Sequence, residues 1–411
     1  MGVPSYFSYL IRNHKEMLIK IFNFKKQINN LYFDSNSIIY DALRILSKDY
    51  DTYKNDDLFE NELINMVCIN IENYINDVKP NKKVLIAFDG VAPVAKLEQQ
   101  RNRRFKRWLE SEICKDQLTT WPTASITPGT KFMADLAKGV KTYFKKWKSP
   151  TVIVSSSEEP GEGEHKIFQF IRENALEHKD QTTVIYGLDA DLIMLTLNHL
   201  HISQSMYLYR ETPHFIRSID KSLDPEKLYC IDIPELAASI TEEMKCGSHE
   251  KIDTRRVHDY ILLCFLLGND FMPHFPCLNI RTDGTETLLE VYRGTVGACG
   301  KYITDGDTIE WPMFRLLIKE LANRELELYK SEYTRRARMQ RVTKLGRPGA
   351  NTINDKIQNL PIVRRDEEIY IAPSETDNAW TIRYYDTLFK FGGSYGTPEK
   401  IAKRKGQVCS R

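Results

Sequence analysis

The sequence lacks the features that mark disulfide-rich, zinc-binding or membrane-spanning proteins. Its eight cysteines are scattered over 411 residues, and no two form the CxxC pair of structural zinc sites. Such spacing predicts reduced thiols rather than a disulfide framework. No stretch approaches the roughly 18 apolar residues of a membrane span, and the first residues lack the apolar core of a signal peptide. We therefore expect a soluble, cytoplasmic protein, with the nucleus as the second possibility.

A large excess of one charge is also missing. Lysine and arginine number 58 and aspartate and glutamate 56, so the formal net charge is only +2. If nucleic acid is the partner, positive charge must be concentrated locally. Apolar residues make up 42% and aromatic residues 11% of the chain, which suffices for a large core.

Short apolar, β-branched runs alternate with amphipathic stretches in the first half of the chain. The runs lie at residues 31–34, 83–90, 151–157 and 182–191. This alternation predicts an α/β fold with a mostly parallel central sheet flanked by helices. Ligands bind beyond the carboxyl ends of the strands in such sheets, so functional residues are expected directly after each run.

Acidic side chains occupy these positions. Two glutamates begin the helix expected after residues 151–157, and a further aspartate lies in the motif FLLGNDFMP. The candidate cluster consists of Asp34, Asp89, Glu162, Glu164, Asp189, Asp191 and Asp270. Any one of them alone could be an ordinary turn former or helix N-cap.

Seven carboxylates around one cleft would repel one another and raise one another's pKa values. Bound cations remove this cost, and hard divalent ions such as Mg²⁺ or Mn²⁺ prefer oxygen ligands. Two such ions about 3.5–4 Å apart can activate water and stabilise the leaving oxygen in phosphodiester hydrolysis. The sequence therefore predicts a site for two Mg²⁺ ions, for which Mn²⁺ should substitute.

A basic helix is predicted directly after Asp89, over residues 90–112. Lys96, Gln100, Arg103, Arg104 and Arg107 recur at i, i+4, i+7, i+8 and i+11, which predicts one shared face. Such a face can hold a phosphate through charge-assisted hydrogen bonds. The alternative is a solvated face paired with Glu98 and Glu110. The position next to Asp89 favours phosphate binding, and in that case Phe105, Trp108 and Leu109 are expected to face the core.

Three regions follow from these patterns. Residues 1–250 should form the α/β nuclease core with the acidic metal site and the phosphate-binding helix. Residues 251–330 are predicted to be helical. Residues 331–411 begin with a polar, basic stretch that is broken by glycine and proline, and we interpret this part as a linker or insertion.

Several motifs resemble, in order, the signatures of the Xrn family of 5′-to-3′ exoribonucleases. They are MGVPSYF, FDSNSIIY, FDGVAPVAKLEQQRNRRF, SITPGTKFM, PGEGEHKI, YGLDADLIML and FLLGNDFMPH. The resemblance is close over residues 1 to about 295 and weaker beyond. It implies a fold related to flap endonucleases and PIN-like nucleases, in which a helix-turn-helix-like element after Asp270 completes the active site.

The resemblance also implies roles for individual residues. The seven acids would be catalytic Mg²⁺ ligands, and Lys96, Gln100, Arg103 and Arg104 would form the pocket for a 5′ monophosphate. Tyr40, where the family commonly has histidine, would stack on the first base. The implied reaction converts single-stranded RNA with a 5′ monophosphate to nucleoside 5′-monophosphates, with no membrane and no small-molecule cofactor. No protein partner is indicated.

The chain departs from the family pattern in a few places. Lys131 stands where an acidic residue is usual, and Ser35 and Ser37 replace common alternatives. The chain also ends where the family would continue into a second conserved, aromatic-rich region. The sequence is therefore interpreted as a fragment or as a shortened form with a different substrate channel.

Two other functions compete with this interpretation. A structure-specific flap-type DNA nuclease would use a similar acidic cluster, but the QQRNRR segment is typical of the exoribonucleases. A non-catalytic RNA-binding derivative is the second alternative, and the presence of all seven acids argues against it.

Overall fold

The computed structural model describes residues 6–20, 26–114, 121–210, 221, 223–224, 228–246, 254–272, 274–345 and 379–389. The chain divides into two compact units. The first comprises Met1–His274 and Ile280–Phe314, and the second comprises Phe275–Asn279 and Arg315–Arg411.

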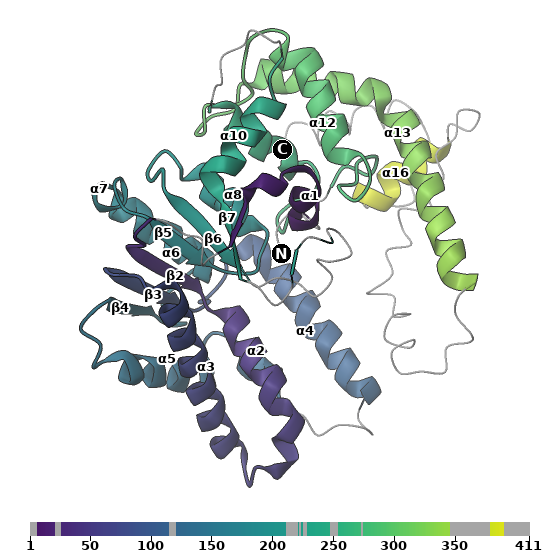
Figure 1. The fold of residues 1–411 in the computed structure, drawn as a ribbon. Coiled ribbons are helices and arrows are strands. Elements are labelled where there is room, and N and C mark those ends of the chain that lie inside the picture. The colour runs from purple at the N-terminus through teal and green to yellow at the C-terminus, as the bar shows by residue number, and fades with distance from the viewer. Residues whose placement is uncertain are drawn as a thin grey trace. The chain divides into compact units, whose positions relative to one another are not determined.

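The first unit is built on a seven-stranded sheet (Figure 1). Its strands are β1 (Leu18–Lys20), β2 (Asn30–Asp34), β3 (Lys83–Ala87), β4 (Thr151–Ser155), β5 (Thr183–Tyr186), β6 (Met206–Arg210) and β7 (Tyr229–Asp232), in the order β1-β7-β6-β5-β2-β3-β4. The five strands from β6 to β4 are parallel, whereas β7 is antiparallel to both β6 and β1. The predicted mostly parallel sheet is therefore confirmed.

The four strands expected from the sequence are β2, β3, β4 and β5. The sequence patterns did not reveal β1, β6 and β7. β1 and β7 comprise three and four residues, too few for a periodicity to be distinguished. In β6, the first four of its five residues are all buried, so no alternation of polar and apolar positions marks it.

Helices cover both faces of this sheet. One hydrophobic core contains Leu31 and Phe33 of β2 together with residues of α2 (Asn36–Leu46), α3 (Asp56–Val78) and α5 (Lys131–Phe144). Tyr32, between them, points to the other face, where its ring lies 5.7 Å from that of Phe170 in α6 (Gly163–Glu173). The strand thus alternates between the two layers, as a sheet that is covered on both faces requires.

The remaining described helices and turns of the first unit complete these layers. They are α1 (Tyr6–Asn13), η1 (Lys15–Met17), η3 (Ser47–Thr52), α4 (Val94–Cys114), η4 (Thr123–Ser125), α7 (Ala175–His178), α8 (Asp191–Asn198), α10 (Ile233–Glu243), α11 (Arg256–Phe265), α12 (Gly284–Tyr292) and the π-helical turn η5 (Arg293–Gly297). α8 and α10 pack against β6, and α11 packs against both of these helices.

The second unit contains most of α13 (Trp311–Leu345) and α16 (Ala379–Phe389). Tyr384 donates a hydrogen bond to Glu325 (3.1 Å), and the Tyr329 and Trp380 rings are 6.4 Å apart. The linker expected from residue 331 is wrong as far as Leu345, because α13 continues to that residue. Good helix formers fill this stretch, and the first glycine and proline follow only at Gly346 and Pro348. Residues 346–378 lie outside the described residues.

None of the helices in the described ranges combines the length and the apolar composition that crossing a bilayer requires.

The central strands should carry the stability of the first unit. Ile86 in β3 is fully buried, so we expect Ile86→Ala to lower the free energy of unfolding by about 2–5 kcal/mol. Ile45 in α2 is 49% exposed, so Ile45→Ala is the matched control. We expect it to change the free energy of unfolding by about 0.5 kcal/mol. Urea unfolding followed by circular dichroism measures both, and equal losses would contradict this placement of the core.

Candidate active site

Three neighbouring strands bring acidic residues to one rim of the sheet. Asp34 is the last residue of β2, and Asp89 follows the end of β3 by two residues. Asp189 follows β5, and Asp191 is the first residue of α8. Because β2 pairs with both β3 and β5 in parallel, these strand ends are adjacent. Single carboxylate oxygens of Asp34, Glu164 and Asp189 lie within 4.8 Å of one another.

The N-terminus of α6 places the two glutamates in the same cluster. Glu162 is the N-cap of α6, Glu164 lies in its first turn, and both are buried. The helix can approach this closely only because Gly163 has no side chain. A Cβ atom at Gly163 would lie 2.6 Å from Oδ1 of Asp34.

Asp89 is oriented by two hydrogen-bond donors. The backbone N–H of Gly163 donates to Oδ1 (2.8 Å), and the side-chain amide of Asn36 donates to Oδ2 (2.6 Å). The sequence analysis did not single out Asn36, although it follows Asp34 by only two residues. Its position in the first turn of α2, beside the end of β2, explains why it reaches the site.

Lys96 of α4 lies inside the acidic cluster. Its Nζ atom is 2.8 Å from Glu162, 3.0 Å from Asp270 and 3.9 Å from Glu164, and the residue is 5% exposed. Burial alone would lower the pKa of Lys96, but the hydrogen bond to Glu162 and the neighbouring carboxylates raise it above its usual value. The ammonium is therefore charged and neutralises part of the cluster.

Asp270 joins the cluster through the same helix. Gln99 donates a hydrogen bond to Oδ1 of Asp270 (2.6 Å), and Lys96 contacts its other oxygen. Burial acts to raise the pKa of Asp270, whereas hydrogen bonds, including those from Gln99 and Lys96, lower it below its usual value. All seven predicted acids thus lie around one rim. Gln99, which holds one of them, was not predicted from the sequence.

The remaining carboxylates carry an electrostatic penalty. Burial raises the pKa values of Asp34, Glu164 and Asp191, and the charges of neighbouring carboxylates raise them further. Oδ1 of Asp191 is buried and has no hydrogen-bond partner among the described residues. Crowded oxygen donors with an unsatisfied buried atom fit a hard divalent cation.

His165 is a second residue that the sequence analysis missed. Its Nε2 atom lies 3.9 Å from Glu162 and 4.0 Å from Glu164, and the three residues form a further group able to hold a cation. Its position directly after Glu164 in PGEGEHK was the available signal.

The predicted basic face of α4 is only partly formed. Lys96 is buried among the acids, while Gln100 and Arg103 are half-buried, and Nη2 of Arg103 is buried without a hydrogen-bond partner among the described residues. Arg104 is exposed. Eight residues turn a helix by about 80° beyond two full turns, which rotates Arg104 away from Lys96.

Tyr40 of α2 lies beside α4 and contacts Arg107. The Arg107 guanidinium lies 5.3 Å from the centre of the Tyr40 ring and donates a hydrogen bond to its hydroxyl (3.2 Å). The role of Tyr40 in stacking on a base remains a prediction.

The expectation that Phe105 and Trp108 face the core is wrong. Their side chains are 51% and 55% exposed, and their rings are 5.5 Å apart. Leu109 is half-buried. The reason is that α4 turns its polar side, with Lys96 and Gln99, toward the buried acids, so the aromatic side is left at the surface.

Comparison with known proteins identifies a family and several relatives that this chain resembles. Residues 1–212 match the family described as XRN 5′-3′ exonuclease N-terminus, and residues 251–369 match the Xrn1 helical domain. The chain is 33% identical over 360 residues to 5′-3′ exoribonuclease 1 of Saccharomyces cerevisiae, covering 79% of this chain and 23% of the relative. It is 29% identical over 408 residues to 5′-3′ exoribonuclease 2 of Candida glabrata, covering 82% and 39%.

The chain thus spans about two fifths of the length of the exoribonuclease 2 relatives. Among solved structures, the catalytic core of Rad2 in complex with a DNA substrate is similar with a TM-score of 0.40 and 15% identity, covering 80% of this chain and 84% of that one.

The raised pKa values predict a pH-dependent stability. The folded protein keeps a proton on Asp34 at pH values where the unfolded chain has lost it. The stabilisation that this proton provides is complete below about pH 4, the ordinary pKa of a carboxyl group. It is lost as the pH rises through the raised pKa of Asp34.

We therefore expect Asp34→Asn to raise the Tm of the metal-free protein at pH 8 and to leave it nearly unchanged at pH 4. Added Mn²⁺ should raise the Tm of the unaltered protein at pH 8 more than that of the variant. Asp77→Asn, at an exposed position of α3, is the matched control. A variant that is less stable than the unaltered protein at both pH values would contradict the electrostatic account.

Proposed function

The chain belongs to the XRN 5′-3′ exonuclease family, and we propose that it hydrolyses single-stranded RNA from a 5′-monophosphorylated end to nucleoside 5′-monophosphates. The observation that carries this proposal is the convergence of seven acids on one rim, beside the basic helix α4. They come from β2, from α6 and its N-cap, from α8, and from the three loops that hold Asp89, Asp189 and Asp270. No alternative nucleophile is needed for phosphodiester hydrolysis at such a site.

The acidic residues would hold two divalent cations. Asp34, Glu164 and Asp189 offer carboxylate oxygens that lie within 4.8 Å of one another, and Oδ1 of Asp191 is a further oxygen without a hydrogen-bond partner among the described residues. Bound Mg²⁺ or Mn²⁺ supplies activation of water and stabilisation of the leaving oxygen. Glu162 and Asp270 bind Lys96, so their carboxylates are shared between this ammonium and any cation.

The residues around the acids hold them in place before substrate arrives. Asn36 and the N–H of Gly163 fix both oxygens of Asp89, and Gln99 fixes one oxygen of Asp270. Hydrogen bonds to metal-binding side chains orient them and tune their affinity. Asn36 and Gln99 are therefore proposed as positioning residues of the site.

Recognition of the 5′ phosphate is assigned mainly to Arg103. Its buried Nη2 lacks a hydrogen-bond partner among the described residues, which suits a phosphate oxygen. Gln100 lies almost one helical turn before it and is half-buried. Lys96 takes part from within the acidic cluster, where it links the phosphate pocket to the cation site, and Arg104 contributes from an exposed position.

One RNA degradation time course tests the proposal. RNA of one sequence, bearing a 5′ monophosphate, triphosphate or hydroxyl, is incubated with Mg²⁺ or with EDTA. We expect mononucleotides to form much faster from the monophosphate RNA than from the other two, and only with Mg²⁺. Asp191→Asn should lower the rate by at least roughly 100-fold with an unchanged circular dichroism spectrum, because even hydrogen-bond partners of metal ligands are worth 10–100-fold. Survival of all three RNAs would exclude this activity for the chain.

The Arg103 assignment makes a separate prediction. Arg103→Ala removes a charge-assisted hydrogen bond of about 1.5–3 kcal/mol, so we expect kcat/KM on 5′-phosphate RNA to fall by roughly 10- to 150-fold. The residual rate on 5′-hydroxyl RNA should hardly change. Arg101→Ala, at an exposed position of the same helix, is the matched control. Equal losses on both RNAs would remove Arg103 from the phosphate pocket.

A further inference from the structure

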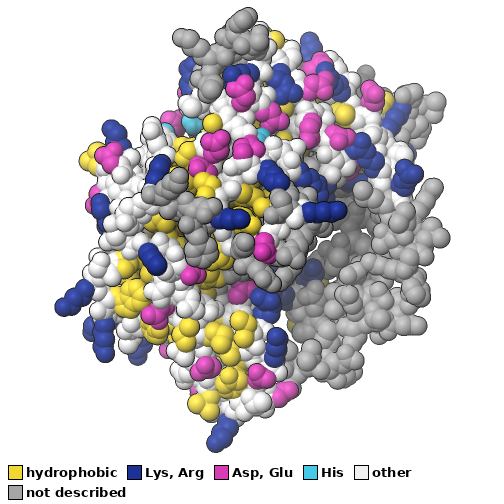
Figure 2. Space-filling view, viewed as in Figure 1, with side chains coloured by type: hydrophobic (Ala, Val, Ile, Leu, Met, Phe, Trp, Pro, Cys, Tyr) yellow, Lys and Arg dark blue, Asp and Glu magenta, His cyan; other side chains and the backbone are white. Residues whose placement is uncertain are grey.

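A second concentration of positive charge lies on α5 and the segment that follows it. Residues 136–157 contain five lysines and no aspartate or glutamate, although the whole chain has a net charge of only +2. The rest of the chain is therefore net negative. The five residues are Lys138, Lys141, Lys145, Lys146 and Lys148, and all are exposed. Figure 2 shows acidic and basic side chains mixed on the face it presents, so an acid-free segment is a departure from that mixture.

These lysines form no close ion pairs, although Glu158 lies beside the same cavity and Asp135 directly precedes the acid-free segment. None of the five forms an ion pair within 4.0 Å with any residue of the described ranges. Lys131, at the start of the same helix, behaves differently, because its Nζ lies 3.2 Å from Asp57. A cluster of ammonium groups without close ion pairs attracts a polyanion, and the attraction weakens as salt screens it.

The lysines border a groove at the edge of the sheet. α5 packs beside β4, which is the last strand of the sheet order. A cavity of about 370 Å³ opens between the helix and the segment after β4. It is lined by Ala134, Ala137, Lys138, Lys141, Thr142, Lys145, Ser156 and Glu158. The short side chains of the two alanines leave space on the helix side of this groove. We call the whole groove the lysine groove.

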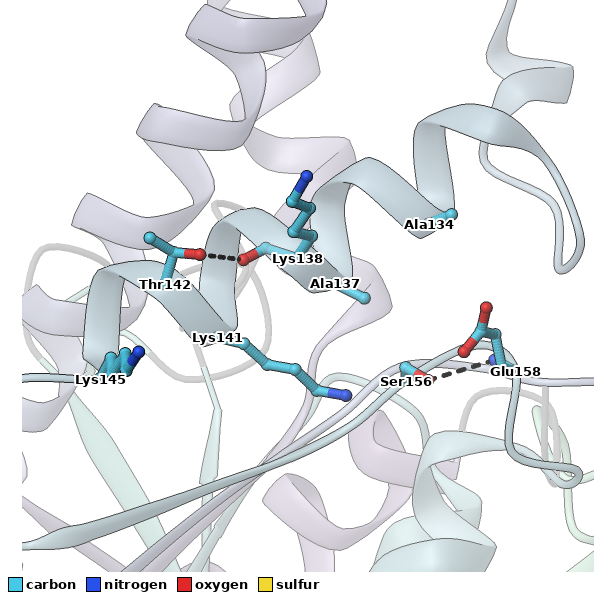
Figure 3. A pocket seen from close by; sticks show the side chains of 8 residues that line it. All are labelled: Ala134, Ala137, Lys138, Lys141, Thr142, Lys145, Ser156 and Glu158. Atoms are coloured by element: carbon cyan, nitrogen blue, oxygen red, sulfur yellow. Dashed lines mark hydrogen bonds between the residues drawn. The ribbon is translucent and has the colours of Figure 1, made fainter.

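The side chains of the lysine groove differ in direction (Figure 3). Lys141 extends from α5 toward the segment with Ser156 and Glu158, whereas Lys138 points away from that segment. The Thr142 hydroxyl donates to the carbonyl of Lys138 (2.7 Å), and the N–H of Glu158 donates to Oγ of Ser156 (3.4 Å). Neither hydrogen bond involves an ammonium group. Lys141 and Lys138 therefore present their charges on two different sides of the helix.

The lysine groove is connected to the candidate active site by a short segment. The loop that begins at Ser156 leads directly to Glu162, the N-cap of α6. The hydroxyl of Ser155, the last residue of β4, donates to Glu159 in this loop (2.5 Å), and the N–H of Gly161 donates to the carbonyl of Val91 in the loop after β3 (3.0 Å). The groove therefore reaches the same rim of the sheet as the acids and runs away from it along α5.

We propose that the lysine groove binds the phosphodiester backbone of RNA outside the active site, an inference that rests on the proposed function. Lys138, Lys141 and Lys145 are three and four residues apart, so they rise by about 4.5 and 6 Å along the helix. Point charges in such a row attract successive phosphates without reading bases. The binding strengthens the hold on long substrates and leaves hydrolysis itself unchanged.

The lining favours a nucleic acid over a protein segment. A peptide added to the edge of β4 would require apolar pockets for its side chains. Among the described residues of α5 and β4, no large apolar side chain is exposed. Trp108 and Phe271 are examples of such exposed side chains elsewhere. The groove instead offers three lysines, two hydroxyl groups and two alanines, with Glu158 as the single acid in its lining.

Salt-dependent binding of RNA to the full chain tests the inference. The triple variant Lys138→Gln, Lys141→Gln and Lys145→Gln removes the charges while keeping good helix formers. Binding of a long single-stranded RNA is measured by fluorescence anisotropy across a salt series, in the Asp191→Asn background so that the RNA survives. The slope of log K against log salt changes by about 0.7 for each phosphate contact on a single strand. We expect the triple variant to show a slope shallower by about 2.

The control is the triple variant Lys48→Gln, Lys54→Gln and Lys179→Gln, at exposed positions outside α5 and outside the lining of the lysine groove, which should keep the original slope. With Asp191 restored, the groove variant should hydrolyse a four-nucleotide 5′-phosphate RNA at an unchanged rate. An unchanged slope in the groove variant overturns the inference, as does an acidic peptide that binds the unaltered chain but not the variant while RNA binding stays the same.

Failure of the inference is distinguishable from failure of the proposed function. If the unaltered chain degrades 5′-phosphate RNA but the slope does not change in the groove variant, the lysine groove alone is refuted. If the unaltered chain degrades no RNA, the nuclease proposal fails, and a shallower slope in the groove variant would still support RNA binding at the lysine groove.

Discussion

Repulsion between buried carboxylates is the constraint on which the candidate site depends. The pKa values of Asp34, Glu164 and Asp191 are raised because burial and neighbouring negative charges both disfavour ionisation. One ammonium, that of Lys96, and fixed hydrogen-bond donors offset part of this cost. The protein thus places more carboxylates at one rim than its own cations neutralise, and this is the electrostatic basis on which we propose that divalent cations bind there.

The fold creates this crowding by close backbone approach. Parallel pairing puts the ends of β2, β3 and β5 side by side, and α6 adds its two glutamates from above the sheet. Two glycines make the approach possible. A Cβ atom at Gly90 would lie 1.8 Å from the carbonyl oxygen of Glu159, and one at Gly163 would meet Asp34. The loops after β3 and β4 are held together at these positions, where Gly90 donates a hydrogen bond to Gly161 (2.8 Å).

Positive charge is placed at two locations with different surroundings. On α4, Lys96 is buried among carboxylates and Arg103 is half-buried, so this charge suits recognition of one terminal phosphate. On α5, the lysines are exposed and lack acidic neighbours within ion-pair distance among the described residues, which suits weaker, salt-sensitive attraction of many phosphates. Under the two proposals, a chain with a net charge of only +2 would attract a polyanion through these two local concentrations of positive charge.

The sequence by itself determined the parallel sheet and the positions of the acids, because a strand and the residue after it are local features of the chain. It did not determine the partners of those acids. Lys96 meets Glu162 across 66 residues, Asn36 meets Asp89 across 53, and Gln99 meets Asp270 across 171. No local pattern encodes contacts over such separations in the sequence. The exposure of Phe105 and Trp108 was likewise decided by tertiary structure, since α4 buries its charged side rather than its aromatic one. Helical periodicity shows which residues share a face, but only the packing of α4 against the acids decides which face is buried.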